Sequence, residues 1–198
     1  MYHMVQRRTT DSRESGGAGE TLLAAAVDHV AANGVGDFSL RQLAAALGTS
    51  HRMLIYHFGS KEGLLVAVVR MVEQRQRDVL AALGADPANS AEEAGRRFWR
   101  DVSDPALQAH ERLFFELYGR ALQGYPGTTE LLDGIVESWL EPLAALLRRY
   151  GFAEERARVQ ARLAIAVGRG LLLDLLATGE RERVNESMEM FLSMVAAS

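Results

Sequence analysis

The chain has 198 residues, which is enough for one large domain or two small ones with a buried core. Hydrophobic residues make up 48% and charged residues 24%, as in an ordinary soluble globular protein, and the formal net charge is −4. Because the chain has no cysteine, a disulfide framework, a thiolate metal site and a cysteine nucleophile are all excluded.

No segment has the pattern of an export signal or a membrane span. The first 19 residues hold three arginines, two acids and no apolar run. The longest nearly apolar stretch, residues 163–177, contains Arg169 and Asp174 and is too short for a transmembrane helix. We therefore expect a cytoplasmic protein with no membrane partner.

The spacing of apolar residues predicts helices throughout, so the expected fold class is all-α with about nine helices. Residues 1–18 are polar, contain two adjacent glycines and show no periodicity, so they are expected to form a flexible arm. Serines stand at the expected starts of the second, third and fourth helices, where a side-chain oxygen can cap the backbone. The expected helices cover residues 20–32, 40–47, 51–57, 61–83, 90–101, 105–123, 128–150, 153–178 and 181–197.

Residues 39–58 combine two short helices with a three-residue turn, the arrangement of a helix-turn-helix motif. Arginine can bind guanine or phosphate, tyrosine can bind phosphate, and apolar side chains can contact thymine methyl groups. A generic helical hairpin with solvent-exposed side chains is the alternative interpretation. On a helical wheel Leu54 faces the core, and the outward side and its flanks carry Arg52, Met53, Ile55 and Tyr56.

The same region has an unusual charge for this chain. Residues 39–61 contain Arg41, Arg52, Lys61 and two histidines but no acid, although the chain as a whole is net negative. An acid-free stretch in an acidic protein is typical of a surface that faces an anion. Chance in a short window is the alternative.

Residues 20–69 resemble the DNA-binding domain of the TetR family of transcriptional regulators. The resemblance rests on the turn at Gly34, the sequence SLRQLA, the turn GTS, and the sequence YHFGSKEGLL that leads into the fourth helix. It covers about 50 residues, a quarter of the chain. It implies a helix-turn-helix domain over residues 19–65 and a ligand-binding and dimerisation domain over residues 66–198, an antiparallel helical bundle linked by the helix at 61–83.

The resemblance also implies which residues meet DNA, with Lys61 on the phosphate backbone. One position departs from the family pattern, because an aromatic residue, commonly tyrosine, usually follows the buried leucine, and here Ile55 does. Either Tyr56 takes over the phosphate hydrogen bond or Ile55 makes an apolar contact instead. The residues expected at the DNA are Ser39, Arg41, Ser50, His51, Arg52, Met53, Ile55, Tyr56, His57 and Lys61.

Aromatic residues are concentrated in the second half of the chain, on long amphipathic helices. A helical bundle lined by aromatic side chains with few polar groups suits a small apolar or aromatic ligand. Ordinary core packing is the alternative for each of these residues. The expected pocket consists of Trp99, His110, Phe114, Tyr118 and Trp139, with His110 as the polar anchor.

Residues 163–177 are apolar on nearly every side, so this helix must be covered on both faces. The cover is either a partner subunit, joined by the last helix, or other helices of one larger bundle. A homodimer would also supply the second recognition helix that a short helix-turn-helix motif needs. The expected interface residues are Leu163, Val167, Gly170, Leu171, Val184, Met188 and Phe191.

No catalytic residue, cofactor or metal is expected, because the chain has no His-x-x-x-His pair, no glycine-rich phosphate loop and no serine in a nucleophile context. An enzyme is therefore not expected. The sequence favours a repressor that binds an inverted repeat of double-stranded operator DNA as a homodimer and leaves it when a ligand binds. The alternatives are a helical protein-binding adaptor and a TetR-like activator without a small-molecule ligand.

Overall fold

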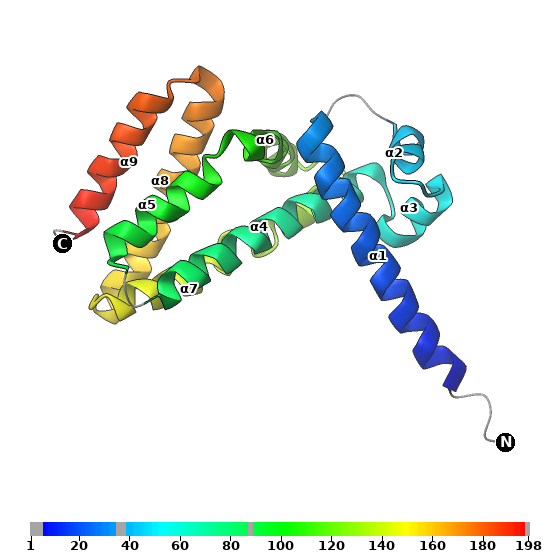
Figure 1. Ribbon diagram of the computed structural model, residues 1–198, viewed down its shortest axis with the longest axis horizontal. Helices are drawn as coiled ribbons and strands as arrows, with labels where there is room; N and C mark the ends of the chain where they lie inside the picture. Colours follow the sequence, from blue (N-terminus) through cyan, green and yellow to red (C-terminus); the bar gives the residue numbers. More distant parts are fainter. Residues whose placement is uncertain (1–5, 35–38, 87–88, 197–198) are drawn as a thin grey trace.

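The structure, a computed structural model, describes residues 6–34, 39–86 and 89–196, with side chains from residue 17 onward. These residues form nine α-helices and two short 3-10 helices, and none of them lies in a strand. The all-α class is therefore confirmed. Figure 1 shows two lobes joined by the long helix α4 (Lys61–Ala85), which reaches from the N-terminal helices into the C-terminal bundle.

The N-terminal lobe contains α1 (Gln6–Asn33), α2 (Leu40–Ala46) and α3 (His51–Phe58), packed against the start of α4. The serines expected as N-caps all act as caps. Their side-chain oxygens accept hydrogen bonds from backbone N–H groups one turn later: Ser39 from Gln42, Ser50 from Met53, and Ser60 from Gly63.

Helix α1 begins earlier than expected. Its backbone is helical from Gln6, so residues 6–18, expected as part of a flexible arm, continue the helix, while residues 1–5 lie outside the described part of the chain. Residues 22–30 of the same helix pack on the core, and adding a residue to an anchored helix is easier than starting a new one. The helix ends as expected at Gly34, which has a φ of 71°.

The C-terminal lobe consists of five α-helices, two of which begin later than expected. Pro105 opens a 3-10 turn, η1 (Pro105–Leu107), capped by Asp104, and the α-helix follows it. Gly134, with a φ of 70°, breaks the segment expected as one helix over residues 128–150 into η2 (Thr129–Leu132) and a later helix. The five are α5 (Ala91–Val102), α6 (Gln108–Leu122), α7 (Glu137–Arg149), α8 (Glu154–Thr178) and α9 (Arg181–Ala196).

Helix α6 belongs to the cores of both lobes. Its buried residues Leu113 and Leu117 share one apolar cluster with α1, α2, α3 and α4. Nε2 of the buried His110 on α6 donates a hydrogen bond of 3.0 Å to the backbone carbonyl of Val27 on α1. A movement of α6 would therefore act directly on the packing of the N-terminal lobe.

Among the described helices, none combines the length and the hydropathy that crossing a bilayer requires.

Candidate DNA-binding surface and ligand cavity

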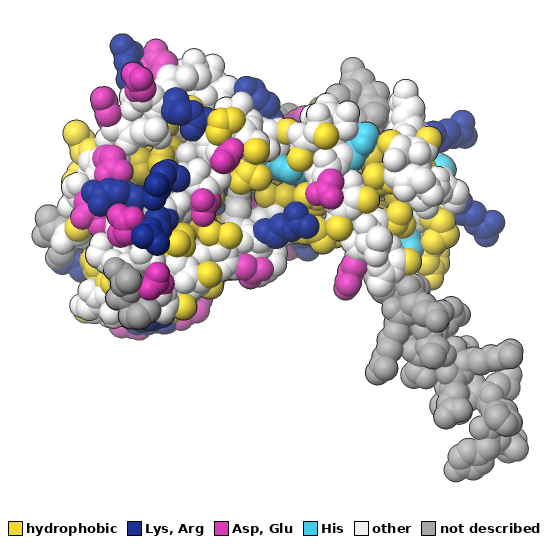
Figure 2. Space-filling view, in the orientation of Figure 1, with side chains coloured by type: hydrophobic (Ala, Val, Ile, Leu, Met, Phe, Trp, Pro, Cys, Tyr) yellow, Lys and Arg dark blue, Asp and Glu magenta, His cyan; other side chains and the backbone are white. Residues whose placement is uncertain are grey.

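The outward face of α3 is the one predicted on the helical wheel. Leu54 is completely buried, whereas Arg52 is exposed and Tyr56 has 69% of its surface accessible. Met53 and Ile55 are exposed on the flanks. Figure 2 shows Lys and Arg side chains at the outer edge of the N-terminal lobe, over α2 and α3. Cations, a phenol and apolar groups are thus presented together on a short helix that can enter a groove.

The two serines expected at the DNA already use their hydroxyl groups within the protein. Ser39 Oγ donates to the side-chain oxygen of Gln42 at 2.9 Å and accepts from its backbone N–H. Ser50 Oγ accepts from the backbone N–H of Met53 at 3.2 Å. Their main role is therefore to fix the starts of α2 and α3. Arg41 and His51 are exposed beside them.

His57, expected at the DNA, faces α1 instead. It is half-buried, and a Cβ placed on Gly19 of α1 would lie 3.0 Å from its Nδ1. The imidazole therefore packs where α1 carries no side chain. The wheel alone could not show this, because it contains no information about where α1 crosses α3.

The turn between α3 and α4 is tight and brings Lys61 to the first position of α4. Gly59 caps α3 with a φ of 74°. A Cβ on Gly63 would lie only 2.2 Å from the carbonyl oxygen of Phe58, so no other residue fits there without backbone movement. This turn fixes α3 relative to α4, and with it the position of Lys61, which is half-buried at the start of α4.

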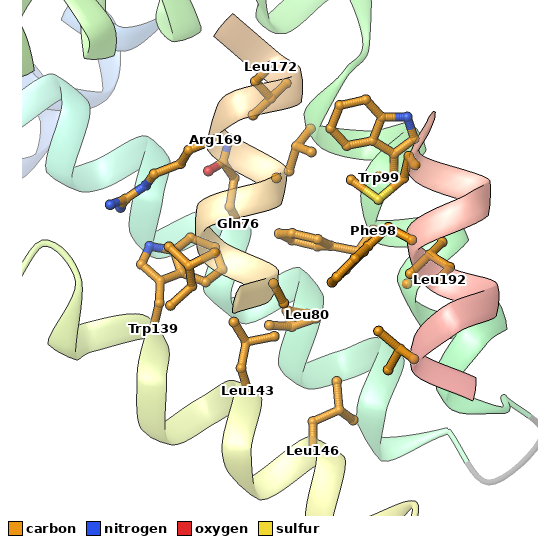
Figure 3. A pocket seen from close by; sticks show the side chains of 18 of the residues that line it. Gln76, Leu80, Phe98, Trp99, Trp139, Leu143, Leu146, Arg169, Leu172 and Leu192 are labelled. Carbon is orange, nitrogen blue, oxygen red and sulfur yellow. The ribbon is translucent and has the colours of Figure 1, made fainter. Parts of the chain in front are cut away.

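The C-terminal lobe contains a cavity of about 170 Å³ between α4, α5, α6, α7, α8 and α9. An apolar cavity of about 150 Å³ in another protein binds benzene, so this one has room for a ligand with one aromatic ring. Trp99, Phe114 and Trp139, expected at a pocket, all line it. In Figure 3, the ring of Phe98 lies between Trp139 on one side and Trp99 on the other.

Two expected pocket residues lie outside this cavity. His110 is turned toward α1 and lines a second, smaller cavity of about 130 Å³ between α1, α4, α5 and α6. Tyr118 stacks on Phe114, with ring centroids 5.5 Å apart, and so supports the cavity wall from outside. Neither side chain is therefore the polar anchor of the larger cavity.

The polar residues that line the larger cavity include two carboxylates that the sequence analysis missed. Glu73 Oε2 accepts a 2.7 Å hydrogen bond from Trp139 Nε1, and its carboxylate lies 3.6 Å from Arg77 and 3.7 Å from Arg169. Burial raises the pKa of Glu73, although these partners oppose the shift.

Glu111 is the second carboxylate and is 7% exposed. Its Oε1 accepts a 2.7 Å hydrogen bond from Gln76. Burial raises the pKa of Glu111 to about 7, and the neighbouring Glu73 adds to the rise. Both acids stand in apolar stripes of their helices, four residues after Val69 and three before Phe114, and this position is the signal that could have marked them.

The outer face of α8 carries an apolar stripe that the described part of the chain leaves uncovered. Val159 is 70% and Leu173 is 51% exposed, and Leu163 and Gly170 lie between them on the same face. Their spacings of four, seven and three residues are those of a helix–helix seam. On α9, Met190 and Met194 are also exposed. Of the expected interface residues, only Leu163 and Gly170 belong to this stripe.

The other expected interface residues face the interior of the same chain. Val184 and Met188 are buried, 2% and 6% exposed, in a cluster with Trp99 and Val102 of α5. The reason is that α5 and α9 cover the inner side of α8, which the sequence pattern could not assign. The remaining three are partly buried against the apolar clusters of this lobe: Val167, Leu171 and Phe191.

Comparison with known proteins agrees with this geometry. Residues 22–68 match the sequence profile of the family described as bacterial regulatory proteins, tetR family. The chain is 26% identical over 200 residues to the HTH-type transcriptional repressor Rv3405c of Mycobacterium tuberculosis, covering 98% of this chain and 97% of the relative.

Solved structures share the fold. A TetR transcriptional regulator from Legionella pneumophila aligns with a TM-score of 0.68 and 24% identity, over 88% of this chain and 95% of that one. A transcriptional regulator from Rhodococcus sp. RHA1 aligns with a TM-score of 0.70 and 21% identity, over 89% and 95%.

A capped helix-turn-helix motif joined to an all-helical second lobe defines a DNA-binding transcriptional regulator. Residues 22–68 carry the DNA-binding domain of the TetR family of such regulators, as the resemblance of residues 20–69 implied, and the fold of the whole chain is that of the solved TetR-family regulators.

Proposed function

We propose that the protein is a repressor that binds an inverted-repeat operator as a homodimer and is released when a small ligand occupies the cavity of the C-terminal lobe. The observation that carries the DNA-binding part is the exposed face of α3, with Arg52 and Tyr56 opposite the buried Leu54. The relative from Mycobacterium tuberculosis is named a repressor, which favours that sign of regulation.

The homodimer forms through α8 and α9. The stripe from Val159 to Leu173 and the methionines Met190 and Met194 are apolar and exposed, and they lie on two helices that pack against each other. Apolar surface of this kind is stabilised when a second copy covers it. A two-fold axis along this face presents two α3 helices, which must lie about 34–36 Å apart to enter successive major grooves of one operator.

Ligand release is a population shift between two subunit spacings. Phe114 and Glu111 on α6 line the cavity, and His110 on the same helix is bonded to Val27 of α1. A ligand that displaces α6 therefore displaces α1 and the attached α3. Only in the dimer without ligand does the distance between the two α3 helices match the distance between adjacent major grooves.

Selection of bound fragments from random double-stranded DNA tests the function. The purified chain should enrich an inverted repeat, and a gel shift on that repeat should show two chains per site. The variant Arg52→Ala should bind the repeat more weakly while keeping its helical circular dichroism. Recovery of no preferred sequence, or of a single half-site bound by one chain, would contradict the proposal.

A further inference from the structure

The two buried carboxylates of the larger cavity differ in how many cations and hydrogen-bond donors stabilise their negative charge. Glu73 is met by Trp139 and by the guanidinium groups of Arg77 and Arg169. Among the described residues, Glu111 has one hydrogen-bond partner, the neutral amide of Gln76, and no lysine or arginine nitrogen lies within 4.0 Å of it. Arg169 acts on Glu111 only from beyond that distance, so one wall of the cavity carries a carboxylate that no cation of the described residues contacts directly.

Such a group is unfavourable in an empty apolar site. Taking a carboxylate out of water without a cationic partner costs free energy, which a positive charge placed beside it offsets. The surrounding walls are aromatic, with Phe98, Phe114 and Trp139 on the cavity, and aromatic faces attract cations as well. Both features favour a positively charged occupant.

We propose that the cavity binds a small organic cation: an ammonium group beside Glu111, carried by an aromatic or aliphatic body of about one ring between Phe98 and Trp99. The proposal rests on the proposed function, in which this cavity is the effector site, and deepens it by naming the ligand class. The cavity volume of about 170 Å³ sets the size of the body.

An anionic ligand fits the same walls poorly. The charged side chains among the lining residues are Glu73, Glu111 and Arg169, which sum to one negative charge when all are ionised. The guanidinium of Arg169 already donates to the backbone carbonyl of Ile135 at 2.8 Å. It also lies 5.1 Å from the ring centroid of Phe114 and beside Glu73. The carboxylate of a ligand would therefore find Arg169 already engaged by other groups and would be repelled by Glu73 and Glu111.

A charge series of matched probes tests the assignment. The probes are 3-phenylpropylamine, 3-phenylpropan-1-ol and 3-phenylpropionate, which share one body and differ in the charge of the end group. The full-length dimer is titrated at pH 8 and followed by tryptophan fluorescence, because Trp99 and Trp139, the two tryptophans of the chain, both line the cavity. We expect the amine to bind at least tenfold more tightly than the alcohol and the carboxylate to bind most weakly.

The variant Glu111→Gln should bring the affinity for the amine to within threefold of that for the alcohol. Binding of the alcohol itself should stay within twofold of the wild type, which shows that the cavity is intact. The matched control is Glu116→Gln on the same helix, whose carboxylate is exposed and paired with Arg120 at 2.7 Å. It should keep the full preference for the amine.

Three results would overturn the proposal: equal binding of the three probes, tightest binding of the carboxylate, or an amine preference that Glu111→Gln leaves unchanged. Binding of none of the three probes by the folded dimer would overturn it as well. A separate operator titration distinguishes it from the proposed function. If the amine binds with the expected preference but leaves operator affinity unchanged, the ligand assignment stands and ligand release fails.

Discussion

At the residue scale, Glu111 should make stability depend on pH. Burial raises its pKa to about 7 from 4.5, so between these values the folded chain holds this proton more tightly than the unfolded chain does. The contribution of Glu111 to the free energy of unfolding is therefore fully present below pH 4.5 and falls as pH rises through 7, by about 3 kcal/mol at most. Urea unfolding at pH 5 and pH 8 should show Glu111→Gln gaining stability over the wild type only at pH 8. An equal effect at both pH values would contradict this.

Substitution of Arg52 and of Lys61 should weaken DNA binding in two different ways. If Arg52 contacts a base, Arg52→Ala should cost about 1–3 kcal/mol per half-site and relax the preference at one base pair. Lys61→Ala should instead weaken binding to all sequences and reduce the slope of log affinity against log salt by about one unit per half-site. Titrations of the operator and of scrambled DNA at several salt concentrations separate the two. Should Arg52→Ala and Tyr56→Phe both leave affinity unchanged, the reading face must instead lie around His51, Met53 and Ile55.

Single residues could be predicted from the sequence where local periodicity decides their environment. The wheel separated the buried Leu54 from the exposed Tyr56 because both lie on one short helix. Periodicity within one helix could not show what surrounds His57 on α3 or Glu111 on α6, since their surroundings come from helices distant in the chain. The signal for Glu111 was a charge within an apolar stripe, which is also compatible with a long side chain reaching solvent.

At the element scale, the turn between α3 and α4 depends on Gly63. Gly63→Ala places a methyl group 2.2 Å from the carbonyl oxygen of Phe58, so the backbone must move. We expect a loss of about 1–3 kcal/mol in the free energy of unfolding, together with weaker operator binding. The matched control is Gly119→Ala on α6, where a Cβ would meet no atom within 4 Å, and it should stabilise the helix by up to about 1 kcal/mol. Thermal unfolding of both variants measures this, and equal effects would refute the role of the turn.

Helix starts and stops were predictable where short-range chemistry sets them. The capping serines Ser39, Ser50 and Ser60 and the break at Gly34 are local signals, and each lies at the predicted boundary. The delayed start of α7 was also locally encoded, by the turn dipeptide at Asp133 and Gly134, but the apolar spacing around it continued the helical pattern. Which side of α8 is covered within the chain depends on the packing of α5 and α9, and the sequence pattern contains no such information.

At the scale of the whole molecule, the apolar stripe of α8 should decide the oligomeric state. Light scattering of the wild type should give about twice the monomer mass of 21.7 kDa. Leu173→Arg puts a charge into the proposed seam and should yield monomers whose operator affinity is about a hundredfold lower or worse, because two linked half-sites are lost. The control Leu122→Arg changes another exposed leucine, at the end of α6, and should remain dimeric. A monomeric wild type that still binds the full inverted repeat would refute the dimer.

The two lobes should be coupled through His110. Its hydrogen bond to the Val27 carbonyl joins α6, which lines the ligand cavity, to α1 of the DNA-binding lobe. His110→Leu fills the same place at the second cavity with an apolar side chain and removes this bond. Because His110 does not line the larger cavity, amine binding should stay within twofold of the wild type.

Coupling free energies between two sites are typically about 1–3 kcal/mol, and the hydrogen bond between His110 and Val27 is one route by which α6 transmits that coupling to α1. We therefore expect the amine to reduce operator affinity less in His110→Leu than in the wild type, and, by reciprocity, the operator to reduce amine affinity less. Operator titrations with and without saturating 3-phenylpropylamine measure the first ratio and fluorescence titrations with and without operator the second. Unchanged ratios in the variant would place the coupling elsewhere along α4 or α6.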